Sequence, residues 1–412
     1  MSSQSSSVKR RNFIRDSGLL IAGGAIGGAS HGAPASQPVD VQPLRVAFVG
    51  CGRRARELSS VLLGQTKLNS HCDDSLDPNE MGSREVVVTA LADFFGSQVQ
   101  SFYRSLKGRF KSSIGDGCRR VSGADCLEGV LQDDVDLVFV TTPPVCRPEF
   151  FSKLVSAGKH VFLEKPLAAS TSGVEQIRDV SKNAQQSGLT IHVGFQRRYD
   201  PSYRQAIEKI REGLIGKPLY ARTFCRVNEL RELPPRRKES EIEFQLRNWK
   251  HFRWTGGDFL LEQHVAGLDL IRQTIGEQPN VVHGFGGWNR HAGDTVGDVY
   301  DHHSVDFEYP SGFVCSSNCR RKESWNQSGE FIHGAEGTAE LSAGRITDSH
   351  GEILWKGLPP SPKAATHLQL SALLNSIRTG AAENQIDGAA ESTLLALAAQ
   401  EATLTGKRIR IS

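Results

Sequence analysis

The sequence predicts two domains: a doubly wound α/β domain built on a parallel sheet, followed by an α+β domain with a mainly antiparallel sheet. Three observations support this fold class. Short apolar runs alternate with helical patterns over the first half of the chain, which is typical of a parallel sheet. Several strands with alternating apolar and polar residues then follow one another, as in antiparallel sheets. The chain has 412 residues, of which 38% are hydrophobic and 23% charged, enough for two cores.

The first domain is expected over residues 44–200. Residues 85–92 are nearly all apolar, which indicates a strand buried on both faces, and this strand ends at Asp93. A polar insert, residues 64–83, precedes it. The expected strands are residues 44–49, 85–92, 135–140, 160–163 and 189–194, and the expected helices are residues 53–63, 97–106, 148–157 and 173–186.

The second domain is expected over residues 201–412. A helix begins near Tyr203, and a charged Pro-Pro loop separates a strand from the next helix. Cys315 and Cys319 share one face of an expected strand, which favours core packing over metal binding, and we expect no metal site. The remaining expected elements are a strand at 219–227, a helix at 262–274, several strands between 281 and 343, and helices at 368–378 and 389–405.

Residues 1–35 have the features of a twin-arginine export signal. The basic start, residues 9–15, precedes an apolar, glycine-rich stretch at residues 18–29 and a small-residue site at Ala33-Pro34-Ala35. The stretch is shorter than the roughly 20 residues of a membrane span, so a retained anchor is the weaker alternative. We therefore expect export to the periplasm by the twin-arginine translocase, with residues 36–43 as a linker.

Removal of this signal leaves a nearly neutral protein. The signal carries a charge of +3, which equals the excess of 49 Lys and Arg over 46 Asp and Glu in the whole chain. Nucleic-acid and anionic-membrane partners require a clustered positive charge, so neither is expected. Twin-arginine export follows folding in the reducing cytoplasm, and the eight cysteines are scattered, so we expect free thiols.

A glycine turn follows the first expected strand. Gly50-Cys51-Gly52 joins this strand to a helix whose backbone N–H groups can hold a pyrophosphate. Such glycine pairs occur in many tight turns, and Asp93 alone is more simply a helix cap. Together they favour NAD, because a carboxylate at the end of the second strand can bind the ribose hydroxyls. Arg53 and Arg54 are candidate phosphate contacts, which leaves NADP use open.

Two further motifs lie at expected carboxyl ends of parallel strands. Thr141-Thr142-Pro143 follows the strand at 135–140, and Glu164-Lys165-Pro166 follows the strand at 160–163. Ligands of doubly wound sheets bind at this edge, so both motifs are expected to face the glycine turn. Taken alone, the first motif is a plain turn and the second a solvated strand end. Together with the glycine turn, we expect Thr141, Thr142 and Pro143 to line the nicotinamide side.

Several stretches of the chain match one known family in order. The most specific is Gly158-Lys159-His160-Val161 continuing into Glu164-Lys165-Pro166. The others are Val49-Gly50-Cys51-Gly52, Thr141-Thr142-Pro143-Pro144, residues 193–201, Gly216-Lys217-Pro218, Gly256-Gly257-Asp258 and residues 262–269. With these motifs the mature chain resembles the glucose-fructose oxidoreductase and inositol dehydrogenase family (Gfo/Idh/MocA), and within it the exported subgroup with a Glu-Gln-His-Val core.

The resemblance implies a Rossmann domain, an open-faced sheet domain, NAD(P) between them and a sugar, polyol or inositol-like substrate over the nicotinamide. It implies that Lys165 contacts the reacting hydroxyl and the cofactor, with Glu262 as the acidic partner. Desolvation beside a nicotinamide cation favours the neutral amine, which makes Lys165 a candidate proton acceptor. Glu164 and Gln196 are expected cofactor contacts. The open sheet offers a pairing surface, and we expect a homo-oligomer.

The chain departs from the family pattern where a histidine is usual. Ala266 stands four residues beyond Glu262, on the same helical face, where the family usually places the acid/base histidine. His264 is the candidate replacement if the turn there is irregular, and a structural role is the alternative. His302 and His303 are further candidates or plain strand residues. The usual histidine after the Thr-Pro turn is also absent, and Arg147 lies near that position.

The substrate-contact candidates are Arg197 and Tyr199 within the matched stretch and Trp254 in the second domain. Trp249, Trp288 and Trp325 also belong to that domain, where tryptophan rings form either sugar platforms or core. Two alternatives to dehydrogenation stay open: glycoside cleavage through transient NAD-mediated oxidation, and an NAD- or sugar-binding protein without activity, which Ala266 motivates. For an exported enzyme, we expect the cofactor to leave the cell already bound and to be regenerated in place.

Overall fold

The computed structural model describes residues 42–64, 86–132, 134–228, 232–288, 297–323 and 325–411. The predicted export signal, residues 1–35, lies outside these residues. So do most of the predicted linker, residues 36–43, and most of the polar insert, residues 64–83. Among the helices in these ranges, none combines the length and apolar character needed to cross a membrane.

The first part of the chain forms a six-stranded sheet in the order β3-β2-β1-β4-β5-β6. All of its neighbouring strands run parallel, which confirms the predicted doubly wound sheet. Val49 at the end of β1 pairs with Val140 at the end of β4, so the turns that follow these strands meet at one edge. The strands are β1 (Leu44–Val49), β2 (Val86–Asp93), β3 (Ile114–Ser122), β4 (Leu137–Val140), β5 (His160–Leu163) and β6 (Ile191–Val193).

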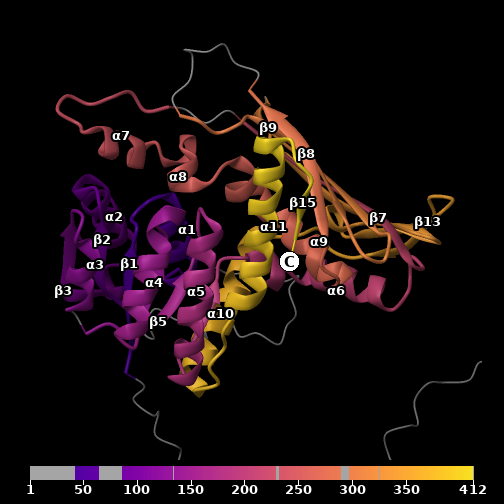
Figure 1. The fold of residues 1–412 in the computed structure, drawn as a ribbon. Coiled ribbons are helices and arrows are strands. Elements are labelled where there is room, and N and C mark those ends of the chain that lie inside the picture. Colours follow the sequence, from indigo (N-terminus) through magenta and orange to yellow (C-terminus); the bar gives the residue numbers. More distant parts are fainter. Residues whose placement is uncertain are drawn as a thin grey trace, which may run out of the picture. The chain divides into compact units, whose positions relative to one another are not determined.

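Helices cover both faces of this sheet (Figure 1), as expected when apolar strands must be buried on each side. Ring stacking of Phe48 on Phe139 and tilted packing of Phe139 on Phe162 extend one core across the three central strands. The helices are α1 (Arg53–Leu62), α2 (Gly96–Arg109), α3 (Cys126–Leu131), α4 (Arg147–Ser156) and α5 (Thr171–Gln186).

The sequence prediction was wrong between residues 107 and 134, because it omitted β3 and α3. β3 is an edge strand and pairs only with β2 among the described residues. Its side chains are mostly exposed or half-buried, and Cys118 is its one buried residue. A strand with no buried apolar run gives no signal of the kind that identified its neighbours.

The second sheet has nine strands in the order β14-β13-β12-β11-β7-β10-β9-β8-β15. Its pairs are antiparallel except β7 with β10, which confirms a mainly antiparallel sheet and makes it mixed. Cys315 and Cys319 lie buried on one face of β10, as predicted. The strands are β7 (Pro218–Asn228), β8 (Val281–Gly287), β9 (His302–Glu308), β10 (Val314–Glu323), β11 (Gln327–Gly334), β12 (Gly337–Glu340), β13 (Arg345–Asp348), β14 (Ile353–Lys356) and β15 (Ile409–Arg410).

The last long helix of the chain packs on both sheets. Contacts join α11 to α5 beside the first sheet and to α9 and β8 of the second. The helix before it, α10, places Leu370, Leu373 and Leu374 in the same core cluster as Phe48 and Phe139, so residues from the predicted second domain complete the core of the first. The remaining helices are α6 (Pro201–Arg211), α7 (Glu241–Arg247), α8 (Arg253–Gly256), α9 (Val265–Ile275), α10 (Pro362–Thr379) and α11 (Ile386–Thr405).

One predicted helix is irregular. The sequence predicts a single helix over residues 262–274, whereas the chain forms a π-helical turn at Leu260–His264 before the regular helix α9. Asp258 caps the turn by accepting from the Leu261 N–H at 3.1 Å. π-turns inside helices are rare and often occur at functional sites.

Candidate active site

The glycine turn after β1 is shaped by a close backbone approach. Gly50 has φ +95°, and a Cβ there would lie 2.7 Å from the carbonyl carbon of Thr141. The Thr141 hydroxyl donates to the Gly50 carbonyl at 2.6 Å, which ties the turn to the end of β4. Asp93 at the end of β2 accepts from the Cys51 N–H at 2.7 Å and from the Phe95 N–H at 2.8 Å. Burial raises the pKa of Asp93, and these two donors oppose the rise.

These residues fit a dinucleotide. The amino end of α1 has no side-chain cap, so its N–H groups are open to an anion. A Cβ built on Gly52 meets no heavy atom within 4 Å, which leaves room above the turn. In this cradle the pyrophosphate of NAD would be held by the α1 N-terminus and its ribose by Asp93.

The two arginines after the turn differ in their surroundings. Arg54 donates to Glu164 Oε1 at 2.6 Å and to Gln196 Oε1 at 3.1 Å. It therefore links the amino end of α1 to Glu164 and Gln196, two further predicted cofactor contacts. Arg53 is 83% exposed and lies 3.5 Å from Glu57 on the next helical turn.

Arg147 holds the Thr-Pro turn. Its guanidinium is buried and donates to the Thr142 carbonyl at 3.0 and 2.7 Å, to the Glu164 carbonyl at 2.8 Å and to the Pro166 carbonyl. Pro143 follows Thr142 and directly precedes a short 3₁₀ turn, Pro144–Cys146. Burial lowers the pKa of Arg147 to about 10. The side chain thus joins the ends of β4 and β5.

Lys165 follows β5 and its side chain crosses to the second domain. Its ammonium donates to the backbone carbonyl of Glu262. Burial lowers the pKa of Lys165, although Glu262 and Glu164 favour its charged form. Glu164 is itself buried, and a Cβ on Gly194 would lie 2.6 Å from its carboxylate. Glycine at 194 therefore allows the end of β6 to pack against this carboxylate.

The carboxylate of Glu262 has two partners, and neither of them is Lys165. Lys250 Nζ lies 2.9 Å from Glu262 Oε1, and Gln263 Nε2 donates to Glu262 Oε2 at 2.7 Å. Burial alone would raise the pKa of Glu262, but the positive charges of Lys250 and Lys165 outweigh it and lower that pKa to about 2. The carboxylate is therefore ionised throughout the physiological pH range.

The side chain of His264 points toward β10 of the second sheet. Its Nε2 lies 2.7 Å from the Ser317 hydroxyl on β10, and the side chain is buried. Burial, with repulsion from Arg197 and His303, lowers its pKa to about 3, so the imidazole stays neutral. The irregular turn that the sequence analysis required is present, but it directs this ring into the sheet.

A cleft of about 380 Å³ lies beside Lys165, with Ala266 in its wall. Arg197 enters the wall with its guanidinium 2.6 Å from Glu330, a buried carboxylate on β11. The lining residues are Lys165, Gly194, Phe195, Gln196, Arg197, Cys225, Arg226, Val227, Gln263, Ala266, Asn326, Gln327 and Ser328. The structure thus brings Lys165, Gln196 and Arg197 together, as the sequence analysis expected of a single site.

Other predicted residues lie outside the cleft lining. Tyr199 accepts from Gln385 Nε2, and its hydroxyl lies 3.5 Å from the buried His192. Trp254 is 47% exposed and donates to Gln245 at 2.6 Å. His302 lies beside Asp301, and His303 beside Asp258.

Sequence reasoning missed Lys250, Gln263, Glu330 and the cleft segment 326–328. Only Gln263 had a local signal, since it adjoins Glu262 in a matched motif.

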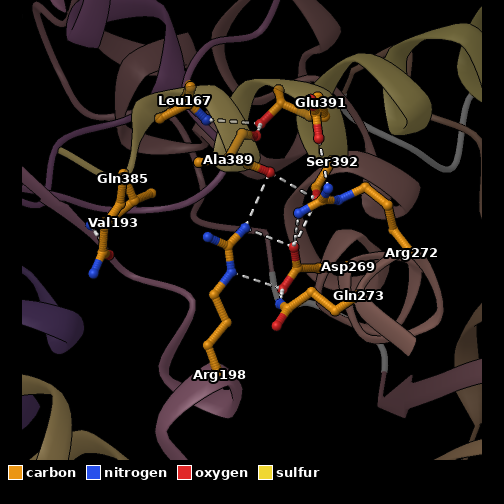
Figure 2. A network of polar contacts seen from close by, with 12 residues as sticks. Leu167, Val193, Arg198, Asp269, Arg272, Gln273, Gln385, Ala389, Glu391 and Ser392 are labelled. Carbon is orange, nitrogen blue, oxygen red and sulfur yellow. Dashed lines mark hydrogen bonds and ion pairs between the residues drawn. The ribbon is translucent and has the colours of Figure 1, made fainter. Parts of the chain in front are cut away.

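A network centred on Asp269 joins α9 to α11 and to Arg198 (Figure 2). Arg198 donates to both carboxylate oxygens of Asp269, at 3.0 and 2.7 Å, and Ser392 of α11 donates to one of them at 2.6 Å. Arg272 reaches Ser392 at 2.9 Å and Glu391 at 2.5 Å. Because Arg198 follows Arg197, this network fixes the segment that supplies the cleft wall.

Comparisons with known proteins agree with this architecture. A model described as "Oxidoreductase family, NAD-binding Rossmann fold" matches residues 44–195, and one for the GFO/IDH/MocA C-terminal domain matches residues 203–340. The chain belongs to the Gfo/Idh/MocA family. Its N-terminal part is accordingly an NAD-binding Rossmann domain of an oxidoreductase family.

Two curated relatives illustrate the range of this family. The chain is 30% identical over 229 residues to scyllo-inositol 2-dehydrogenase (NAD⁺) of Bacillus subtilis (strain 168), covering 55% of this chain and 60% of that protein. It is 28% identical over 224 residues to 2,7-anhydro-N-acetylneuraminate hydratase of Escherichia coli (strain K12), covering 54% of this chain and 55% of that protein. The chain thus matches little more than half the length of these relatives.

Solved structures share the fold over nearly the whole chain. Myo-inositol 2-dehydrogenase from Lactobacillus plantarum aligns with a TM-score of 0.67 at 20% identity, over 90% of this chain and 100% of that one. Scyllo-inositol dehydrogenase from Lactobacillus casei with bound NAD(H) and scyllo-inositol aligns with a TM-score of 0.63 at 18% identity, over 89% and 99%. At these identities the likeness establishes the fold.

Proposed function

We propose that this protein transfers hydride between a nicotinamide cofactor and a hydroxyl of a sugar, polyol or inositol-like substrate bound in the cleft. The observation that carries the proposal is the placement of Lys165. It follows a strand of the NAD-binding sheet, lies beside the ionised Glu262 and lines the cleft. A proton acceptor is needed at this point, because loss of hydride from a carbinol carbon is accompanied by loss of the hydroxyl proton.

Residues of the site have separate roles in proton transfer and substrate binding. Lys165 accepts the hydroxyl proton in its neutral form, which burial favours. Glu262 stays ionised, and its negative charge stabilises the positive charge that Lys165 acquires. Gln196 and Arg197 in the cleft wall would donate hydrogen bonds to the substrate. The bound nicotinamide would supply the hydride acceptor. NAD is the expected cofactor, and NADP use is left open by Arg53 and Arg54.

The test is turnover on a panel of sugars, polyols and inositols with NAD and NADP, followed by the absorbance of the reduced nicotinamide. The proposal expects reduction with at least one compound of this class. Tight binding of NAD without turnover of any of them would favour a binding protein instead.

A second candidate is cleavage or hydration through transient oxidation, with no net redox change. It is favoured by the similarity to 2,7-anhydro-N-acetylneuraminate hydratase. Released product without accumulated reduced nicotinamide would identify this chemistry.

We also infer that the protein is exported by the twin-arginine translocase with its cofactor already bound, and that it forms a homo-oligomer. The motif at residues 9–15 supports export, and the nine-stranded sheet offers a surface for association. Cell fractionation, nucleotide analysis of the purified periplasmic protein and sedimentation test these three points. Protein that remains cytoplasmic, lacks nucleotide or sediments as a monomer would contradict the corresponding inference.

A further inference from the structure

The wall of the cleft has no titratable group at position 266, so another feature of the site must set the proton chemistry. Ala266, Gln263 and Lys165 line the cleft together. His264, the nearest histidine in sequence, bonds to Ser317 inside the sheet. If the proposed function holds, Lys165 must then accept the proton without a histidine partner at 266.

Lys250 is a second lysine beside the same acid. It lies in a short 3₁₀ turn, Trp249–His251, ahead of α8, and its ammonium is 2.9 Å from Glu262 Oε1. Gln263 occupies the other carboxylate oxygen at 2.7 Å. Lys165 reaches only the backbone carbonyl of Glu262. Both carboxylate oxygens are thus held by groups other than Lys165.

We propose that Lys250 is a positioning residue, which holds the Glu262 carboxylate away from the Lys165 ammonium and thereby leaves Lys165 free to exchange its proton in the cleft. The inference rests on the proposed function for its meaning, but the arrangement of the two lysines is testable without substrate. Glu262 and Lys250 are 12% and 25% exposed, so solvent screens their interaction only in part.

The other charged groups around Lys165 and Glu262 do not hold the Glu262 carboxylate in place. Glu164 and Arg54 also face Lys165, but they form a 2.6 Å ion pair with each other. The thiol of Cys225 is a further titratable group near Lys165, and burial raises its pKa to about 11, so it is neutral. Arg321 and Arg147 face Glu262 from other elements; Arg147 is engaged by backbone carbonyls and Arg321 donates to the Lys250 carbonyl at 3.1 Å.

Loss of Lys250 is expected to raise the pKa of Lys165. Without Lys250, Glu262 Oε1 loses its ammonium partner and attracts the Lys165 ammonium, and the repulsion between the two lysines disappears. Both changes raise the pKa of Lys165, by about one unit for a partly screened charge at this range. At a pH below that pKa, the neutral fraction of Lys165 falls about tenfold for each unit.

The experiment follows Lys165 itself in the full chain loaded with NAD. Trace acetylation with acetic anhydride across pH, quantified by mass spectrometry on the Lys165 peptide, gives its pKa in wild type, Lys250→Met and Lys250→Arg. We expect a rise of about one unit in Lys250→Met and a wild-type value in Lys250→Arg. The exposed Lys182→Met serves as the matched control. Lys250→Gln repeats the test if the Met variant does not fold.

A comparison in the Glu262→Gln background separates two effects of Lys250 on Lys165. One acts through the Glu262 carboxylate, and the other is direct charge repulsion. If Lys250 acts by holding the carboxylate, Lys250→Met shifts the Lys165 pKa less in that background than in the wild type. An equal shift in both backgrounds, or an unchanged Lys165 pKa in folded Lys250→Met, overturns the inference. Failure of every substrate in the turnover panel, with the acetylation shift present, would overturn only the proposed function.

Discussion

The cofactor side and the substrate side of the cleft hold their polar groups in different ways. At the ends of β1, β4 and β5, Thr141 and Arg147 bond to backbone: Thr141 to Gly50, and Arg147 to the Thr142 and Glu164 carbonyls. The ion pair of Arg54 with Glu164 is the exception on this side. Beside α9, side chains bond to one another: Lys250 to Glu262, Arg197 to Glu330, and His264 to Ser317.

The contacts of Thr141 and Arg147 on the cofactor side therefore depend on backbone geometry, whereas the contacts on the substrate side depend on the charges of paired side chains. Backbone carbonyls do not titrate, so the contacts of Thr141 and Arg147 with backbone are not lost through ionisation of their acceptors. The substrate side depends on paired charges, and a change to one member alters the ionisation of its partner. We therefore expect substitutions at the Arg147 contacts to change the shape of the turns, and substitutions in the pair of Lys250 and Glu262 to change ionisation.

The largest expected effect comes from Lys165, which joins the two sides. Lys165→Met removes the proposed proton acceptor, and we expect kcat to fall by about 10²- to 10⁴-fold. Binding of NAD, measured by calorimetric titration, should persist because the glycine turn is unchanged. Lys182→Met, on the exposed face of α5, is the control. Full activity in Lys165→Met would refute the role given to this residue.

The next largest effect tests the ion pair of Arg197 and Glu330 on the substrate side. Arg197→Met leaves the buried carboxylate of Glu330 without its 2.6 Å partner, which should cost about 3–5 kcal/mol of the free energy of unfolding in urea. The double variant Arg197→Met/Glu330→Gln should recover part of this loss. Arg53→Met, at an 83% exposed site, should change stability by less than about 0.5 kcal/mol. Equal stability of Arg197→Met and wild type would contradict the buried pair.

A smaller effect tests the backbone-held side with a matched glycine pair. Gly50→Ala places a Cβ 2.7 Å from the Thr141 carbonyl carbon at φ +95°, and we expect a loss of about 1–3 kcal/mol in stability. Gly52→Ala meets no atom within 4 Å and should fold normally. Thermal unfolding compares the two. The account of the turn is contradicted if Gly52→Ala is the more destabilised variant.

The smallest effect is the acid sensitivity contributed by His264. Its pKa is lowered to about 3 in the folded protein from 6.5, so between these values the unfolded chain binds a proton that the folded chain does not. The contribution of the neutral His264 to the free energy of unfolding is fully present above pH 6.5. It is lost as the pH falls, by about 1 kcal/mol over the first pH unit below 6.5. His264→Gln should remove this slope in urea titrations, whereas the exposed His350→Gln should retain it. Identical slopes for His264→Gln and wild type would contradict the buried neutral imidazole.

The parts of the site that could be predicted from sequence are those built by consecutive residues. Gly50 lies at the end of an apolar strand and Lys165 at the end of another, and parallel pairing brings such strand ends to one edge. That rule is general, so it required no knowledge of the rest of the chain.

The parts that could not be predicted depend on register and local irregularity. Thr223 on β7 pairs with Ser317 on one side and Glu330 on the other, and this pairing of distant segments forms the buried floor under α9. No local pattern gives that register. The π-turn at Leu260–His264 likewise rotates His264 into the sheet, where an ideal helix would have placed it elsewhere.

The most direct test of the central claim is a crystal structure of the protein with NAD and a substrate from the turnover panel. The account predicts that the reacting hydroxyl lies within about 2.6–3.2 Å of Lys165 Nζ, with Lys250 still on the Glu262 carboxylate. A substrate bound away from Lys165, whose ammonium remains on the Glu262 carbonyl, would contradict it.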